Sequence, residues 1–160
     1  MIDKTNNIQH KVCVALLYIT GARPIEIAML KTRDFTINEN DIRIFLTTKK
    51  RGINRLLIFD KNTPFVQELI IPYINQLLKE GREDIFDFKT SDRIKQIVYL
   101  LSDNKLTPYS FRHNRLTQLA LAGATPYELM VFKGAKSLDS ISPYIYRSPN
   151  MLVNLKDKIR

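Results

Sequence analysis

The chain has 160 residues, of which 44% are hydrophobic and 26% charged, values typical of one globular domain with a proper core. Its 25 lysine and arginine residues exceed its 16 aspartate and glutamate residues, which gives a formal net charge of +9. This surplus favours a polyanionic partner, nucleic acid before an anionic membrane, with a merely basic soluble protein as the alternative. The sequence has neither an apolar run of membrane-spanning length nor the apolar segment of a signal peptide, and its single cysteine and two histidines argue against a zinc site.

The first third of the chain predicts two helices and a small sheet. Residues 8–20, IQHKVCVALLYIT, are apolar almost all round and predict a buried helix. GARPIEIAML then opens a second helix, with Pro24 suited to its first position. DIRIFLT (41–47) and RLLIF (55–59) predict two strands joined by a hairpin tip, and a short strand at 35–37 completes an antiparallel sheet of three strands.

The rest of the chain is predicted to be helical, so the fold class is α+β and mainly α-helical. Residues 63–81 carry a helical stripe that Pro72 should kink or split in two. Further helices are predicted over 93–101, from an N-cap at Thr107 to a stop at Gly123, near 126–133 and near 137–146, followed by an amphipathic tail at 148–160.

Two arginines stand at helix starts. GARPIE (21–26) is repeated as GATPYE (123–128), where Thr125 and Glu128 form a capping box. In the first copy Arg23 takes the N-cap position, although its side chain cannot accept the free N–H groups and its charge opposes the helix dipole at a cost of about 0.3–1 kcal/mol. Arg112 lies near the start of the helix that follows Thr107. A helix N-terminus beside a guanidinium suits a phosphate, so the two sites could converge on one phosphate.

Each of these candidate residues also has an ordinary explanation that involves no ligand. Arg23 could be exposed and paired with Glu26, and His113 could be a structural histidine. Lys49, Lys50 and Arg51 could form a solvated turn, although such a tip could also reach a DNA groove or a leaving oxygen. Two arginines, a hairpin lysine and a tyrosine close to the end of the chain fit phosphoryl transfer through a phosphotyrosine.

These motifs resemble those of the catalytic domain of tyrosine recombinases, the phage-type integrase family. TGARPIEIAMLKTRDF resembles the first family box, which implies that Arg23 is the first catalytic arginine and that Glu26 supports it. TTKKRGINRLLIF is similar to the family hairpin, in which the catalytic lysine lies five residues before an arginine. Counting back from Arg55 selects Lys50 rather than Lys49.

TPYSFRHNRLTQLALAGAT resembles the second box, His-x-x-Arg-His, and places the second arginine at Arg112 with His113 as its supporting histidine. In the family the nucleophile stands ten residues after a glycine, which here selects Tyr144 and leaves Tyr146 as a packing residue. Two positions depart from the pattern. Tyr109 replaces the first histidine of the second box and is retained as a catalytic candidate, because its hydroxyl can donate to a phosphate oxygen.

The second departure is Ala135, which stands where the family has histidine or tryptophan. Alanine can neither donate a hydrogen bond nor act as a base. Lys133 or Lys136 could compensate for this substitution.

The resemblance implies a DNA recombinase or integrase that needs no cofactor or metal. Tyr144 would attack a phosphodiester, Arg23 and Arg112 would neutralise the developing charge, and Lys50 would protonate the leaving oxygen. DNA contacts are expected from Lys49, Arg51, Arg55 and Lys136. The expected partner is double-stranded DNA, bound by an oligomer of up to four copies that is monomeric without DNA, in the cytoplasm and on the nucleoid.

The resemblance also implies a domain organisation. Residues 1–160 correspond to the catalytic domain, ending in the tail at 148–160, and the N-terminal DNA-clamping domain of the family is expected to be absent from the chain. A type IB topoisomerase-like enzyme, a non-catalytic DNA-binding module derived from a recombinase, and a membrane-surface role are the rival hypotheses. The departures at Tyr109 and Ala135 support the non-catalytic module.

Overall fold

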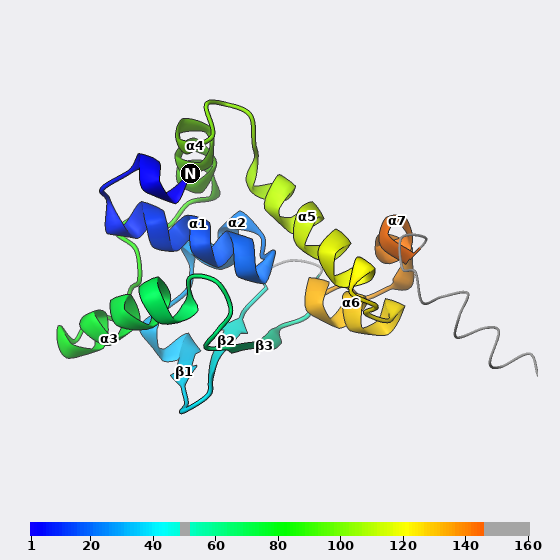
Figure 1. Cartoon of the computed structure of the whole chain (residues 1–160), viewed down its shortest axis with the longest axis horizontal. Helices are drawn as coiled ribbons and strands as arrows, with labels where there is room; N and C mark the ends of the chain where they lie inside the picture. Colours follow the sequence, from blue (N-terminus) through cyan, green and yellow to red (C-terminus); the bar gives the residue numbers. More distant parts are fainter. Residues whose placement is uncertain (49–51, 146–160) are drawn as a thin grey trace, which may run out of the picture.

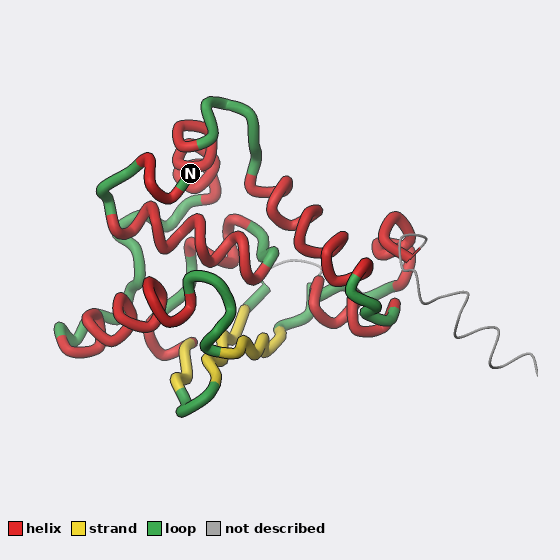
Figure 2. Tube along the Cα trace, in the orientation of Figure 1, coloured by secondary structure: helices red, strands yellow, loops and turns green. Residues whose placement is uncertain are grey.

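The structure is a computed structural model that describes residues 1–48 and 52–145. Its elements are α1 (Ile8–Thr20), α2 (Pro24–Ala28), β1 (Phe35–Ile37), β2 (Asp41–Leu46), β3 (Arg55–Asp60), α3 (Ile71–Lys79), α4 (Ser91–Leu101), α5 (Pro108–Leu121), α6 (Pro126–Lys133) and α7 (Ser142–Ile145). The strands gather on one side of a helical body (Figure 2), which confirms the predicted fold class. No helix in the described part of the chain is long and apolar enough to cross a membrane.

Helix α1 forms the centre of the main core. Val12, Leu16 and Ile19 have no exposed surface, and the helix lies between α4 and α5 on one side and the sheet on the other (Figure 1). The inward side chains of the sheet belong to the same hydrophobic cluster. Because α1 is surrounded, its apolar residues need no single stripe, which explains the nearly continuous apolar sequence.

The sheet is antiparallel in the order β1-β2-β3. Phe35 pairs with Ile44, and Leu46 at the end of β2 pairs with Arg55 at the start of β3. Successive residues of a strand face opposite sides, so Arg55 shares the inner face of β3 with Leu57 and Phe59. A charged residue is therefore carried into the interior by the strand register.

Three helix starts follow the sequence prediction. Arg23 is the N-cap residue of α2 and makes no side-chain cap, while Glu26 in the first turn accepts a hydrogen bond from the Arg23 backbone N–H at 2.7 Å. Thr107 and Thr125 cap α5 and α6 through their hydroxyl oxygens. Helix α2 thus keeps half of a capping box, and the Arg23 guanidinium donates to the Glu26 carboxylate at 3.3 Å instead of capping the helix.

The segment 63–81 splits before Pro72. Phe65 has a positive φ of 69°, and Val66–Ile70 forms a π-helical turn in which the Ile70 N–H donates to the Phe65 carbonyl at 2.9 Å. Regular α-helix begins at Ile71. Pro72 has no backbone N–H to donate to the preceding turn. The change from π-helix to α-helix therefore lies next to a residue that could not complete the hydrogen-bond pattern in either helix type.

A second, smaller core lies at the C-terminal end of the described chain. It contains Leu116 and Ala120 from α5, Leu129 from α6, and Ile141 and Tyr144 near the end. Helix α5 runs from the main body to α6 and α7 and joins the two cores (Figure 1). The helix predicted near 137–146 is observed as a 3₁₀ turn, Leu138–Ile141, followed by the short α7, while Tyr146 and the tail at 148–160 lie outside the described residues.

Candidate active site

Glu26 is the centre of a buried polar cluster next to the N-terminus of α2. It is 3% exposed and accepts hydrogen bonds from both terminal nitrogens of Arg55, at 2.9 and 3.1 Å, and from the Thr48 hydroxyl at 2.8 Å. The Arg23 guanidinium lies 3.3 Å from the same carboxylate. Burial by itself raises the pKa of Glu26, but the hydrogen bond and charge of Arg55 outweigh it and lower the pKa from 4.5 to about 2. Glu26 is therefore ionised and holds both arginines.

The C-terminal end of α6 binds the two buried arginines, Arg55 and Arg112. The carbonyl of Phe132 accepts from Arg55 Nε at 2.8 Å, and the next carbonyl, of Lys133, accepts from Arg112 Nη2 at 2.7 Å. The carbonyl of Gly134 accepts from the Ile53 backbone at 3.1 Å. The last carbonyls of a helix lack partners within the helix and carry partial negative charge, so they suit guanidinium groups. These bonds fix the hairpin and α5 to one helix end.

Arg112 is held between two helix ends. It is 6% exposed, and its Nη1 donates at 2.7 Å to the carbonyl of Gly21, the C-cap residue of α1. Burial, followed by the charges of Arg23 and Arg55, lowers the pKa of Arg112 from 12.5 to about 10. Arg112 remains charged at neutral pH, and its bond to Gly21 brings α5 to the segment that carries Arg23, two residues further along the chain. That the two arginines bind one phosphate stays a prediction.

Lys133, the last residue of α6, belongs to the same group of cations. Burial and then the charges of Arg112 and Arg23 lower its pKa. Its ammonium group lies 5.7 Å from the centroid of the Tyr144 ring. Since Glu26 is engaged by Arg55, the place around Arg23, Arg112 and Lys133 carries an excess of positive charge, which suits an anion.

Tyr144 is in contact with this group through His113. Its side chain is 7% exposed, and its hydroxyl lies 3.1 Å from Nδ1 of His113, with the two ring centroids 5.3 Å apart. His113 follows Arg112 directly on α5, so the residue that binds the Tyr144 hydroxyl and the buried arginine come from the same helical turn. A phenol, an imidazole and a guanidinium are therefore neighbours.

The other predicted site residues are placed differently. Tyr109 is 55% exposed in the first turn of α5 and makes no hydrogen bond to another described residue. Lys136 is exposed beyond the end of α6. Lys49, Lys50 and Arg51 lie outside the described residues.

Arg55 requires a correction, because it was expected to contact DNA. It is 5% exposed, and each of its three guanidinium nitrogens has a partner inside the protein. A guanidinium that is buried and donates from all three of its nitrogens within the protein is not exposed to a DNA phosphate. Arg55 instead positions Glu26, and the apolar alternation of β3, in phase with Leu57 and Phe59, is the sequence signal that indicates its burial. Thr48 also binds Glu26, but no sequence pattern indicates this contact.

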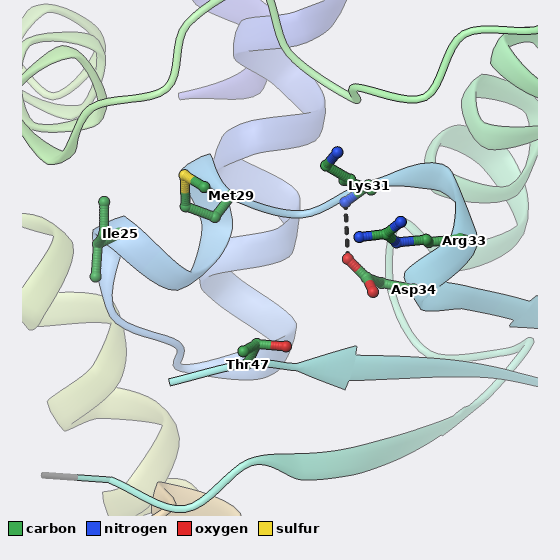
Figure 3. Close-up of a pocket in the computed structure, with 6 residues that line it drawn as sticks. All are labelled: Ile25, Met29, Lys31, Arg33, Asp34 and Thr47. Atoms are coloured by element: carbon green, nitrogen blue, oxygen red, sulfur yellow. Dashed lines mark hydrogen bonds between the residues drawn. The ribbon is translucent and has the colours of Figure 1, made fainter. Parts of the chain in front are cut away.

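A separate cavity of about 170 Å³ lies beside α2 (Figure 3) and is lined by Ile25, Met29, Lys31, Arg33, Asp34 and Thr47. Its two cations are balanced by two carboxylates, because Asp34 also lines the cavity and Glu83 lies 3.1 Å from Lys31 and 3.5 Å from Arg33. The excess of positive charge therefore lies at the arginine pair, not in this cavity. Within residues 1–48 and 52–145, no group of three His, Cys, Asp or Glu side chains is placed to hold a metal ion.

Comparisons with known proteins agree on the family. The model of the phage integrase family matches residues 1–151. The fold is similar to that of the XerA recombinase (TM-score 0.74, 19% identity, 96% of this chain and 59% of that one). It is also similar to the catalytic domain of bacteriophage HP1 integrase (TM-score 0.68, 17% identity, 97% of this chain and 84% of that one).

A third similar structure is the XerH site-specific recombinase bound to palindromic difH substrate in a post-cleavage complex (TM-score 0.70, 16% identity, 97% of this chain and 48% of that one). The chain thus spans less than two thirds of the XerA and XerH chains. No curated protein matches it at the level of sequence. Because the family match covers nearly the whole chain and the fold agrees, the protein belongs to the phage integrase family and has the fold of a tyrosine recombinase catalytic domain.

Proposed function

We propose that the chain is the catalytic part of a site-specific recombinase that cuts and rejoins DNA through a phosphotyrosine. The observation that carries this proposal is that Arg112 is bound to Gly21 beside the Arg23 segment while His113, the next residue, lies 3.1 Å from the Tyr144 hydroxyl. A phosphate would offset the positive charge gathered there. The XerH structures contain their difH DNA substrate, which supports double-stranded DNA as the partner. Assembly on DNA as an oligomer of up to four copies belongs to the same proposal.

In the proposed reaction the Tyr144 oxygen attacks the phosphorus of a phosphodiester. A bond forms between that oxygen and phosphorus, and the bond from phosphorus to the 5′ oxygen breaks, which leaves a 3′-phosphotyrosyl linkage. The phenol proton passes to His113 Nδ1, 3.1 Å away, and Lys50 supplies a proton to the leaving 5′ oxygen. A 5′-hydroxyl from another strand later attacks the phosphotyrosine and reverses the step.

The arginines act on the charge of the phosphate. Arg23 and Arg112 stabilise the non-bridging oxygens as negative charge builds up on them, and Glu26 keeps Arg23 in place. Because Arg112 is already fixed by two backbone carbonyls, its guanidinium need not reorganise when DNA arrives. Every step is assigned to a side chain, so the proposal uses no metal or cofactor. Tyr109 is exposed and would donate to a phosphate oxygen only once DNA covers it.

The substrate must first be identified. The substrate offered is a pool of nicked duplexes with random sequence around the nick. Cleavage of such a duplex releases a short strand that diffuses away, so the covalent protein–DNA adduct cannot be reversed and is trapped. Adducts captured under denaturing conditions are sequenced, and the enriched duplex is resynthesised. We expect the wild type to form adducts, Tyr144→Phe to bind the duplex without forming any, and the matched control Tyr146→Phe to form them.

Three results would contradict this proposal in different ways. Adducts that persist in Tyr144→Phe and disappear in Tyr146→Phe would show that the nucleophile is misassigned. DNA binding without adducts in the wild type would make the chain a non-catalytic DNA-binding module. Relaxation of supercoils without joining between two sites would favour a topoisomerase.

A further inference from the structure

Lys133 is a third cation at the site, and the reaction above gives it no role. Its ammonium group lies 5.7 Å from the Tyr144 ring centroid, and the charges of Arg112 and Arg23 both act on it. Its own backbone carbonyl accepts the hydrogen bond from Arg112 at 2.7 Å. The residue that anchors Arg112 through its backbone thus also brings a cation close to Tyr144.

The hydrogen bonds of Lys133 leave capacity for a ligand. Its ammonium has three donors, and among the described residues it donates only to the carbonyl of Ser140. No carboxylate in the described part of the chain forms an ion pair with it. A partly buried ammonium that is repelled by the charges of Arg112 and Arg23 and lacks a counter-ion among the described residues is electrostatically unfavourable, and a bound anion would reduce this repulsion.

The alanine at position 135 leaves the site without a hydrogen-bond donor that Lys133 could replace. The alanine is 8% exposed and packs with Leu129 and Tyr144 in the second core, so its methyl group fills space and cannot donate to a ligand. Lys133 is two residues earlier and provides a donor close to the same tyrosine, whereas Lys136 is exposed. The backbone of Lys133 is bonded to Arg112, and the charges of Arg112 and Arg23 act on its ammonium group.

We propose that Lys133 donates a hydrogen bond to a non-bridging oxygen of the scissile phosphate and forms the third cationic contact beside Arg23 and Arg112. The inference rests on the proposed function, because the phosphate in question is the one that Tyr144 attacks. Lys133 transfers no proton and forms no bond in the reaction. It exchanges the Ser140 carbonyl for a phosphate oxygen and adds charge where charge develops.

The first test measures anion binding and does not depend on cleavage. Inorganic phosphate is titrated into the full chain at constant ionic strength, with binding followed by calorimetry. We expect Lys133→Met to weaken phosphate binding about tenfold or more, the scale of one charge-assisted hydrogen bond, and Lys133→Arg to stay within about threefold of the wild type. Lys79→Met is the charge-matched control, because α3 lies at the opposite end of the molecule from α6 and α7 (Figure 1).

The second test locates the contact on the reacting phosphate. Single-turnover adduct formation is compared on the resynthesised duplex and on the same duplex with a methylphosphonate at the scissile position, using both diastereomers. Lys133→Met should slow cleavage of the phosphate about 10- to 100-fold, and on at least one methylphosphonate diastereomer the loss should shrink to about threefold or less. A purely structural role would slow both substrates equally.

The outcomes separate this inference from the proposed function. Unchanged phosphate binding in Lys133→Met, or an equal loss of cleavage on both substrates, overturns the role of Lys133 while Tyr144 adducts still support the recombinase. A wild type that binds phosphate through Lys133 but never forms an adduct overturns the cleavage step alone. If the methionine variant does not fold, as judged by circular dichroism, Lys133→Gln replaces it in both tests with the same expectations.

Discussion

Replacing Glu26 with glutamine should destabilise the protein by about 3 kcal/mol at neutral pH. The lowering of the Glu26 pKa from 4.5 to about 2 corresponds to about 3 kcal/mol, at about 1.36 kcal/mol for each pKa unit. The cost of breaking the buried ion pair has a similar value. Arg55 is buried and paired with Glu26 at 2.9 Å, and removing one partner of such a pair typically costs about 3–5 kcal/mol.

The stability difference between the wild type and Glu26→Gln should depend on pH, and it should decrease as the pH falls. The folded-state pKa is depressed, so the stabilisation by Glu26 is fully present above pH 4.5 and is lost as the pH falls towards about 2. The difference in free energy of unfolding between wild type and Glu26→Gln should therefore shrink by about 2 kcal/mol between pH 7 and about pH 3. Urea denaturation of both proteins at each pH measures this difference, and contributions from the other carboxylates cancel. A difference that stays constant over this range would refute the assignment of Glu26 as the ionised centre of the cluster.

Three further variants test the geometry of the site. Gly134→Ala should lose about 2 kcal/mol or more in urea denaturation, because Gly134 has a φ of 69° and an added Cβ would lie 2.7 Å from Arg55 Nη1; a loss below about 0.5 kcal/mol would contradict this. Arg112→Ala should slow adduct formation about 10²- to 10³-fold and weaken DNA binding much less, whereas equal losses would reduce Arg112 to a simple phosphate contact. His113→Phe should slow single-turnover cleavage at least about 100-fold with unchanged DNA binding, and an unaffected rate would exclude His113 as the proton acceptor.

The local structure could be predicted well because its signals lie close together in the sequence. The cap at Thr107, the capping box of Thr125 and the buried helix at 8–20 each follow from a few neighbouring residues, and the structure confirms them. The π-helical turn before Pro72 could not be predicted, since it depends on the left-handed conformation of Phe65, a residue that rarely adopts one.

The site could be predicted only in part, because its contacts join distant segments. The family pattern pointed to Arg23, Arg112 and Tyr144, and in the structure Arg112 is bound beside the Arg23 segment while its neighbour His113 contacts Tyr144. The family pattern does not reveal that Arg55 is buried against Glu26, although the alternation of β3 indicates that its side chain faces inwards. The role of Lys133 is also hidden, since its relation to Tyr144 arises only when α6 and α7 pack together.

The central claim is that Tyr144 forms the covalent bond with DNA, and the position of that bond can be read directly. Trypsin releases residues 137–147, SLDSISPYIYR, as one peptide that contains both Tyr144 and Tyr146. A nuclease first trims the DNA of a trapped adduct to a short remnant that is joined to the peptide through its 3′-phosphate. Fragmentation of this peptide by tandem mass spectrometry then locates the residue that carries the remnant. We predict that it is attached to Tyr144, and attachment to Tyr146 or to any other residue would contradict the account.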